Sequence, residues 1–303
     1  MTKIIKPPKH NQFFLFSIGL CLMVINKIRH ILIGYTTPRP FSTTEIELSI
    51  IYCFNVVKNW ERTLIAYTGN LNPFKGKNII EIGPGPDLGT GIIILALGAK
   101  SYTAIDKNEL INNTSPSFYN VLLNRLKELP GYEKAKIAVN NIPKRNFDEK
   151  FCYIYDPNFN LEKLPDKKFD TLVSQAVLEH IINISEIFQI LYYKLKSHAI
   201  MINEVDLGTH TALIRNLDPL NHLRYSDAVW DLLRFDGSPN RLIMSDYKNI
   251  LVRLGFKKIE AKQLVVIDKE YIKKSKPNLS KRFRKYSDKD IETKSFYLLA
   301  VKE

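Results

Sequence analysis

The sequence contains little cysteine, and its cysteines are not arranged for a disulfide or a metal. Three of the 303 residues are cysteines, Cys21, Cys53 and Cys152, and they stand far apart without a CxxC pair or a histidine cluster beside them. Disulfide frameworks and zinc sites made of cysteine both show characteristic spacings that are missing here. The sequence therefore predicts no metal site and a protein of the reducing cytoplasm.

Long apolar runs are missing as well. The most apolar stretch, residues 13–25, falls short of the about 20 apolar residues that a membrane-spanning helix needs. Polar and basic residues follow it instead of a small-residue cleavage site, which disfavours a secretory signal. Two interpretations stay open. The stretch is either a helix that packs on the domain or a partner chain, or an amphipathic helix that makes peripheral contact with an anionic membrane through its apolar face and basic flanks.

Acidic residues are fewer than basic ones, with 31 Asp and Glu against 44 Lys and Arg and a formal net charge of +13. Such a charge attracts phosphates and anionic surfaces, but lysine is frequent along the whole chain, as compositional drift would also produce. The densest basic stretch, residues 273–285, has few aromatics for base stacking, and no RNA-binding module is recognisable. Nucleic acid is therefore the weakest of the candidate partners.

The pattern that is present is that of an α/β protein. Residues 1–75 show apolar residues at helical spacing and no strand alternation, whereas from residue 77 short apolar runs alternate with loops and helical stretches. We predict strands at 78–82, 101–105, 151–155, 171–174, 199–205, 258–267 and 295–301, and helices at 90–97, 117–129, 184–195 and 245–254. The expected fold is a three-layer, doubly wound, mostly parallel seven-stranded sheet over residues 76–303, with a helical N-terminal extension over 1–75 and an insertion at 207–244 that serves as a substrate cap.

A glycine-rich turn follows the first predicted strand. Glycines let the backbone approach a ligand, and the carboxyl end of a central parallel strand is where α/β proteins bind nucleotides and nucleosides. The glycines fall at Gly83, Gly85 and Gly89, so the third is one residue late for a dinucleotide fingerprint, and no Gly-Lys-Ser/Thr of a phosphate loop follows. Glu81 would repel a pyrophosphate but attract an amino group. The turn therefore favours a cationic, nucleoside-containing cofactor.

This turn resembles motif I of the class I S-adenosylmethionine-dependent methyltransferases, an acid followed by x-G-x-G-x-G. Glu81, Gly83 and Gly85 match, while Asp87 stands where the third glycine is expected. Residues 164–180, with a Leu-Pro turn, a Phe-Asp pair and a Val-Leu-Glu-His ending, are similar to the type-11 methyltransferase segment around strand four. The resemblance covers residues 77–256. It implies a Rossmann-like methyltransferase fold, S-adenosyl-L-methionine as cofactor, and methyl transfer to a small-molecule or carbohydrate-like (glycan) acceptor.

The resemblance also implies a set of cofactor contacts. Asp106, at the end of the second predicted strand, would accept hydrogen bonds from the ribose hydroxyls, although an acid there could simply cap the next turn. Asn160 or Asp156 would contact the adenine amino group, with Asn160 at the spacing that relatives show. The expected cofactor-binding residues are Glu81, Gly83, Gly85, Asp87, Asp106, Asn160 and Gln175, of which Gln175 would meet the methionine part or the substrate.

Candidate catalytic residues follow the fourth and fifth predicted strands. In methyl transfer positioning contributes most, and a base is needed only when the acceptor carries a proton near pH 7. Asp206 and His210 are candidates for that base, and so is His180, whose imidazole titrates near neutrality. Each also has a structural alternative, which is to cap or brace its loop. The alternative functions are a membrane-associated methyltransferase of a lipid-linked acceptor and a basic RNA-binding protein.

Overall fold

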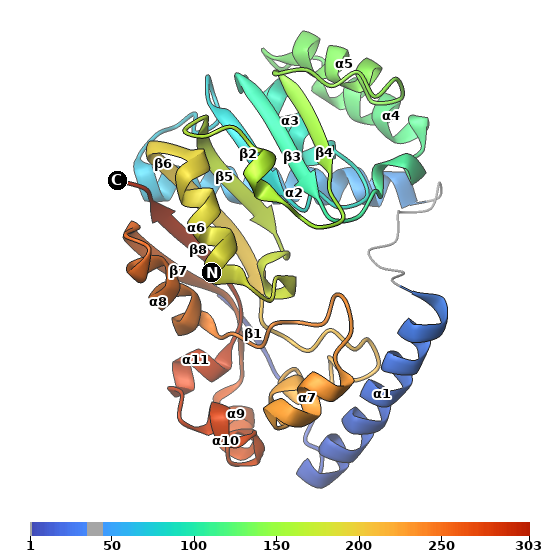
Figure 1. The fold of residues 1–303 in the computed structure, drawn as a ribbon, viewed down its shortest axis with the longest axis vertical. Helices are drawn as coiled ribbons and strands as arrows, with labels where there is room; N and C mark the ends of the chain where they lie inside the picture. The colour runs from blue at the N-terminus through green and yellow to red at the C-terminus, as the bar shows by residue number, and fades with distance from the viewer. Residues whose placement is uncertain (1, 35–44) are drawn as a thin grey trace.

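A computed structural model describes residues 2–34 and 45–303 and shows one eight-stranded sheet (Figure 1). The strands lie in the order β1-β7-β8-β6-β5-β2-β3-β4. β8 runs antiparallel to both of its neighbours, and all other pairs are parallel. The strands are β1 Lys3–Ile5, β2 Asn78–Ile82, β3 Ser101–Asp106, β4 Phe151–Tyr155, β5 Phe169–Gln175, β6 Leu195–Asp206, β7 Lys257–Ile267 and β8 Thr293–Val301.

Helices cover both faces of the sheet, and each face has its own apolar core. One core joins the sheet to α2, α3, α4 and α5, and the other joins it to α6 and α8. α3 is buried on all sides, as its sequence GTGIIILA requires. The helices are α1 Gln12–Ile33, α2 Ile46–Thr68, α3 Gly89–Ala96, α4 Pro116–Leu126, α5 Tyr132–Asn141, α6 Ile184–Lys194, α7 Asp227–Leu233, α8 Met244–Arg253, α9 Lys269–Ser275, α10 Lys281–Arg284 and α11 Asp288–Glu292.

The structure confirms the predicted fold class, a doubly wound, mostly parallel sheet with a helical N-terminal extension. All seven predicted strands and all four predicted helices are present, with ends that differ by a few residues. The expectation that residues 1–75 contain no strand is wrong at β1, which pairs with β7 and makes the sheet eight-stranded. Three residues are too few to show an alternating pattern in the sequence. The segment forms a strand because it pairs with β7 at the edge of the sheet.

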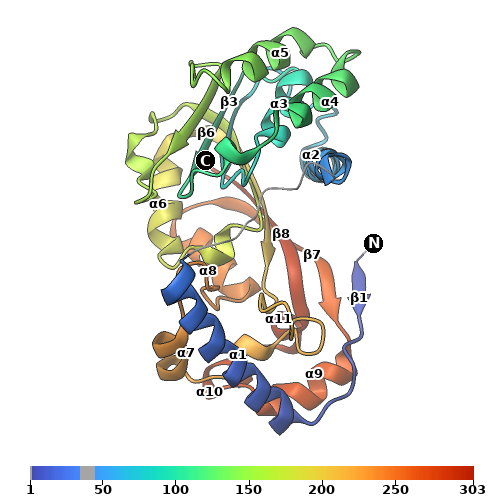
Figure 2. The ribbon, with the colours of Figure 1, turned by 90° about the vertical axis from the view of Figure 1, so that its right-hand side faces the viewer.

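α1 is longer than the apolar stretch that predicts it. The helix continues beyond residue 25 to Ile33 and is long and apolar enough to cross a membrane by length and composition, so the expectation that the segment is too short is wrong. One face of α1, with Leu15, Gly19 and Met23, is buried. This face lies beside α7 and the rest of segment 207–244, as both views show (Figures 1 and 2).

Two polar side chains of segment 207–244 fix this packing. Asn221 donates a hydrogen bond to the carbonyl oxygen of Leu15 at 2.9 Å, and the Tyr225 hydroxyl donates to that of Phe16 at 3.0 Å. A Cβ atom on Gly19 would lie 2.2 Å from the Asn221 side chain, so only glycine allows the helix to approach this closely. The Pro-Leu-Asn sequence at 219–221 therefore has a structural task, which is to hold α1.

A buried ion pair stabilises the same segment. Arg224 Nε lies 2.5 Å from Asp218 Oδ2, and both side chains are fully buried. Asp218 also accepts a hydrogen bond from the Tyr271 hydroxyl of α9 at 2.8 Å. Arg224 is therefore not a surface residue of this segment. Its charge is compensated inside the protein, and the pair ties segment 207–244 to α9.

We expect Asp218→Asn to lower the free energy of unfolding by about 3 to 5 kcal/mol, because it leaves the buried Arg224 guanidinium without a counter-charge. Urea denaturation followed by circular dichroism measures the change. The control is Asp231→Asn, which removes an exposed ion pair to Arg234 and should cost less than about 1 kcal/mol. Equal effects of the two substitutions would contradict the role of the buried pair.

Candidate functional site

The turn between β2 and α3 has the backbone shape that its glycines predict. Gly83 and Gly85 adopt φ values of 66° and 79°, which side-chain-bearing residues rarely do. A Cβ atom on Gly83 would lie 2.6 Å from the Val177 side chain, so the turn after β5 packs directly on this glycine. At Gly85 no atom lies within 4 Å of the Cβ position. The backbone of Gly85 is therefore open to a ligand, while Gly83 is needed for packing.

Glu81 lies inside the protein. Its carboxylate accepts hydrogen bonds from the Thr90 hydroxyl at 2.7 Å and from the Tyr102 hydroxyl at 2.6 Å. Burial raises its pKa from the usual 4.5 to about 7. The carboxylate thus joins β2 to α3 and β3, a structural role that the sequence did not predict. Its contact with an amino group of a ligand stays a prediction.

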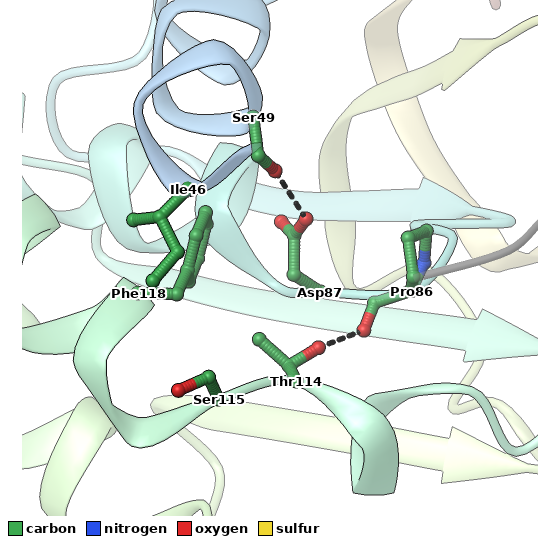
Figure 3. Close-up of a pocket in the computed structure, with 7 residues that line it drawn as sticks. All are labelled: Ile46, Ser49, Pro86, Asp87, Thr114, Ser115 and Phe118. Carbon is green, nitrogen blue, oxygen red and sulfur yellow. Dashed lines mark hydrogen bonds between the residues drawn. The ribbon is translucent and has the colours of Figure 1, made fainter. Parts of the chain in front are cut away.

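Asp87 also points into the protein. Its carboxylate accepts hydrogen bonds from the Gly89 backbone at 2.8 Å and from Ser49 of α2 at 3.4 Å, and Figure 3 shows it directed at Ser49. Asp87, Ser49 and Phe118 line a cavity of about 20 Å³, which has room for about one water molecule and not for a nucleoside. The acid at the third-glycine position therefore holds the turn to α2. Its contact with a cofactor stays a prediction.

Asp106 stands where β3 ends, beside the glycine turn. Its carboxylate accepts a hydrogen bond from the Asn108 backbone at 2.8 Å and a longer one from the Gly85 backbone at 3.4 Å. Burial raises its pKa from 3.8 to about 6. Asp106 thus caps the next turn and also lies beside the open backbone of Gly85. Its contact with ribose hydroxyls stays a prediction.

The two candidates for adenine recognition follow β4. Asn160 is exposed, and its side-chain oxygen accepts a hydrogen bond from the Glu162 backbone at 2.9 Å, so it caps the short helix Leu161–Lys163. Asp156 is buried beside Asp106, and its backbone N–H donates a hydrogen bond to the Asp106 carbonyl oxygen at 3.0 Å. The Asp156 carboxylate forms an ion pair with Lys163. Asp156 is therefore the nearer of the two to the β3 end, although Asn160 has the expected spacing.

Gln175 ends β5 opposite Glu204 of β6 in the sheet register. Its side-chain oxygen is buried and has no hydrogen-bond partner in the described structure. Burial raises the pKa of Glu204, and hydrogen bonds from Gln175 and Tyr297 partly oppose that rise. An unpartnered amide oxygen at the carboxyl end of β5 is suited to accept a hydrogen bond from a ligand, as the sequence predicts for Gln175.

Asp206, the first catalytic candidate, ends β6 in an ion pair. Both of its carboxylate oxygens lie 3.2 Å from Lys294 Nζ of β8, and one accepts a hydrogen bond from the Gly208 backbone at 2.8 Å. Both carboxylate oxygens are thus occupied by partners of the protein itself. The geometry therefore favours the structural alternative for Asp206, the bracing of the loop after β6.

His180 and His210, the other two candidates, come together with a third group. Their ring centroids are 4.8 Å apart, and His210 Nε2 lies 3.9 Å from Glu179 Oε1. Burial and the neighbouring His210 lower the pKa of His180 to about 4, and burial lowers that of His210 and raises that of Glu179. Both imidazoles are thus neutral near pH 7, as a proton acceptor must be.

Glu179 is the member of this cluster that the sequence did not single out. Glu179 belongs to the Val-Leu-Glu-His ending of residues 164–180. The contacts that fix its position come from a segment about 60 residues later in the chain. The Asn240 side-chain amide donates hydrogen bonds to the carbonyl oxygens of Leu178 and Ile181, both at 2.9 Å. The Asn240 backbone N–H donates to the carbonyl oxygen of Glu179 at 2.6 Å. Segment 237–240 therefore clamps the turn that carries Glu179 and His180.

Comparisons with known proteins give distant similarities only. No family model and no curated protein matches the sequence. Among solved structures, a methyltransferase from Archaeoglobus fulgidus is 20% identical with a TM-score of 0.41, covering 82% of this chain and 94% of that one. One from Mesorhizobium loti is 15% identical with a TM-score of 0.41, covering 78% and 95%. The CurJ carbon methyltransferase is 14% identical with a TM-score of 0.48, covering 96% and 68%. Similarities this distant say nothing about the reaction of this chain.

We expect Glu81→Gln to remove a pH dependence of stability. The folded protein holds the Glu81 proton up to about pH 7, whereas the unfolded chain releases it near 4.5, so wild-type stability falls as pH rises between these values. As the pH rises from 5 to 8, wild type should therefore lose up to about 3 kcal/mol of unfolding free energy relative to the variant. Urea denaturation of both proteins at pH 5 and pH 8 measures this. Asp106 contributes equally to both proteins, and parallel pH profiles would contradict the assignment.

Proposed function

We propose that this chain is an S-adenosylmethionine-dependent methyltransferase that acts on a small-molecule or carbohydrate-like acceptor. One observation carries the proposal. The open backbone of Gly85 at the end of β2 lies within hydrogen-bond distance of Asp106 at the end of β3. β2 pairs with β3 on one side and with β5 on the other, so the chain reverses its winding direction here. Ligands of open α/β sheets bind at such a switch point.

The residues at this sheet edge fit the parts of the cofactor. A Cβ-free, open Gly85 allows close backbone approach, the Asp106 carboxylate can accept both ribose hydroxyls, and the Gln175 oxygen is free to accept a donor. Asp156, buried beside Asp106, is the better placed candidate for the adenine amino group. When bound, S-adenosylmethionine supplies a methyl group on a positively charged sulfur. The nearby acidic groups suit that charge.

The acceptor side of the site lies at the ends of β5 and β6. Val177 packs on Gly83, so the turn that carries Glu179 and His180 directly adjoins the cofactor turn. His210 is better suited than His180 to take a proton from an acceptor, because the pKa of His180 is lowered to about 4 and makes it a weak base, whereas Asp206 is held by Lys294. The chain's own residues would thus orient the acceptor and move a proton at an imidazole nitrogen. A cytoplasmic location remains the sequence-based prediction.

The RNA-binding alternative is less favoured by the basic stretch near the C-terminus. Lys276 pairs with Asp288, and Arg282 pairs with Asp227 while its guanidinium lies 5.0 Å from the Phe283 ring. These side chains stabilise the packing of α9, α10 and α11 around a separate apolar core. Two of the basic side chains that would contact phosphates, Lys276 and Arg282, are therefore already paired with acids of the same chain.

We expect full-length wild type to bind S-adenosylhomocysteine, the demethylated product, in isothermal titration calorimetry. Asp106→Ala should weaken that binding by about 1 to 3 kcal/mol, roughly tenfold to a hundredfold, because it removes the hydrogen bonds to the ribose. The control Glu149→Ala removes an exposed acid beside β4 and should bind as wild type does. No binding by folded wild type, or equal binding by all three proteins, would contradict the proposal.

A second candidate function, methyl transfer to a lipid-linked acceptor at a membrane, is favoured by the outer face of α1. This face is apolar, with exposed fractions of 51% at Ile28, 77% at Leu32 and 78% at Phe13. α1 contains no acidic residue, and lysines 3, 6 and 9 precede it. An exposed apolar face with basic flanks suits an anionic lipid surface, in which the helix would lie flat while its other face stays on segment 207–244.

Vesicle co-sedimentation tests this second candidate. Wild type should sediment with vesicles of phosphatidylcholine and phosphatidylserine. The double variant Ile28→Ser with Leu32→Ser should bind about tenfold or more weakly, because two exposed apolar side chains that would enter the lipid are lost. Leu71→Ser changes an equally exposed leucine, 74% accessible, outside α1 and serves as the control. Equal recovery of the double variant and wild type would count against a membrane location.

A further inference from the structure

Three side chains on the acceptor side converge from two separate loops. Glu179 and His180 belong to the 3-10 turn Leu178–His180 after β5, and His210 lies in the loop after β6. One ligand atom from each lies within 4.8 Å of the other two. We propose that Glu179, His180 and His210 bind a divalent transition-metal ion of the zinc class, which differs from the sequence-based expectation of no metal site.

The buried carboxylate is the strongest observation. The Glu179 side chain is 1% exposed, and no side chain in the described structure donates a hydrogen bond to either of its oxygens. The backbone N–H groups of Glu179 and Asp206 oppose the rise of its pKa only in part, so the carboxylate has no charged partner. His210 Nε2 lies 3.9 Å from Glu179 Oε1, beyond hydrogen-bond distance. An isolated carboxylate in this position is costly unless a cation or a proton compensates it. A metal ion held between Glu179 and the imidazoles would supply that compensation.

The orientation of His180 agrees with a ligand role. Its Nδ1 lies 2.7 Å from the carbonyl oxygen of Gly237, which can only accept, so Nδ1 carries the proton. Nε2 then keeps its lone pair. Metal-binding histidines usually donate their second ring N–H to a carbonyl or carboxylate in this way, which fixes the ring and its tautomer. The Gly237 carbonyl lies in the segment whose Asn240 clamps the same turn.

The distances leave room for an ion. Ligand atoms at about 2.1 Å from a tetrahedral zinc ion are about 3.4 Å apart, so the 3.9 Å between Glu179 and His210 needs to shorten by about half an ångström. His210 can move that far because its side chain is 32% exposed. Two imidazoles and one carboxylate form a donor set that zinc prefers, and three protein ligands leave the fourth position open.

The open position has a consequence for the acceptor. This step rests on the proposed function, since it assumes that the acceptor binds beside the cofactor turn. An acceptor with an oxygen or nitrogen donor could fill the fourth position and would be held next to the turn on which Val177 and Gly83 meet. The metal would thus orient the acceptor and favour the deprotonated form of a bound hydroxyl, whose proton would pass to solvent. With the metal bound, His180 and His210 would act as ligands and not as the proton acceptor.

Calorimetric titration of Zn²⁺ into full-length, chelator-treated protein tests the site. Wild type should bind one ion per chain, and Glu179→Gln and His210→Ala should bind at least about tenfold more weakly, because each loses a ligand. The control is His198→Asn, which replaces an exposed histidine of positive φ by a residue that tolerates that conformation. It should bind as wild type does, and circular dichroism checks that every variant is folded.

Three results would overturn the site. They are no zinc binding by wild type at micromolar concentrations, unchanged affinity in Glu179→Gln, and unchanged affinity in His210→Ala. The second would show that Glu179 is compensated by a proton and not by a metal. Replacement of Zn²⁺ by Co²⁺ gives a second readout on wild type alone, since a tetrahedral site gives strong visible absorption. S-adenosylhomocysteine binding is measured separately on the same proteins, so failure of the metal site and failure of the proposed function are distinguishable.

Discussion

The parallel pairing of β2 with both β3 and β5 is the constraint on which the rest of the structure depends. Carboxyl ends of parallel strands meet at one edge of a sheet, and the reversal of winding at β2 leaves that edge uncovered by a crossover helix. Residues far apart in sequence are thereby brought together, Gly85 from one loop, Asp106 from the next and Gln175 from a third. The buried Glu81 strengthens this arrangement because its two hydroxyl partners join β2 to α3 and to β3.

Much of this fold could be predicted from the sequence because its strands are continuous apolar runs that end in turns. The glycine turn after β2 could also be predicted, since Gly83 and Gly85 adopt positive φ values, which favour glycine. The inward orientation of the Glu81 and Asp87 side chains could not be predicted from the sequence. It depends on hydrogen-bond partners on other elements, Tyr102 for Glu81 and Ser49 for Asp87. The same holds for Arg224, whose burial depends on Asp218 and α9 and leaves no local signal in the sequence.

The acceptor side shows why site residues are harder to predict than strands. His180 and His210 were recognised as single candidates, but their closeness follows from the pairing of β5 with β6 and from the Asn240 clamp. No spacing in the sequence links residue 179 to residue 210. Segment 207–244 joins these features, because it carries His210 and Asn240 and also holds α1 through Asn221. One segment therefore contacts both α1 and the turn Leu178–His180.

The most direct measurement of the central claim is a crystal structure of the full chain with S-adenosylhomocysteine. We expect the ribose hydroxyls within hydrogen-bond distance of the Asp106 carboxylate and the amino acid part beside the Gly85 backbone, with the sulfur directed toward the turn that carries Glu179 and His180. Density for the ligand elsewhere on the protein, or a structure from saturated crystals with no ligand at this edge, would contradict the claim.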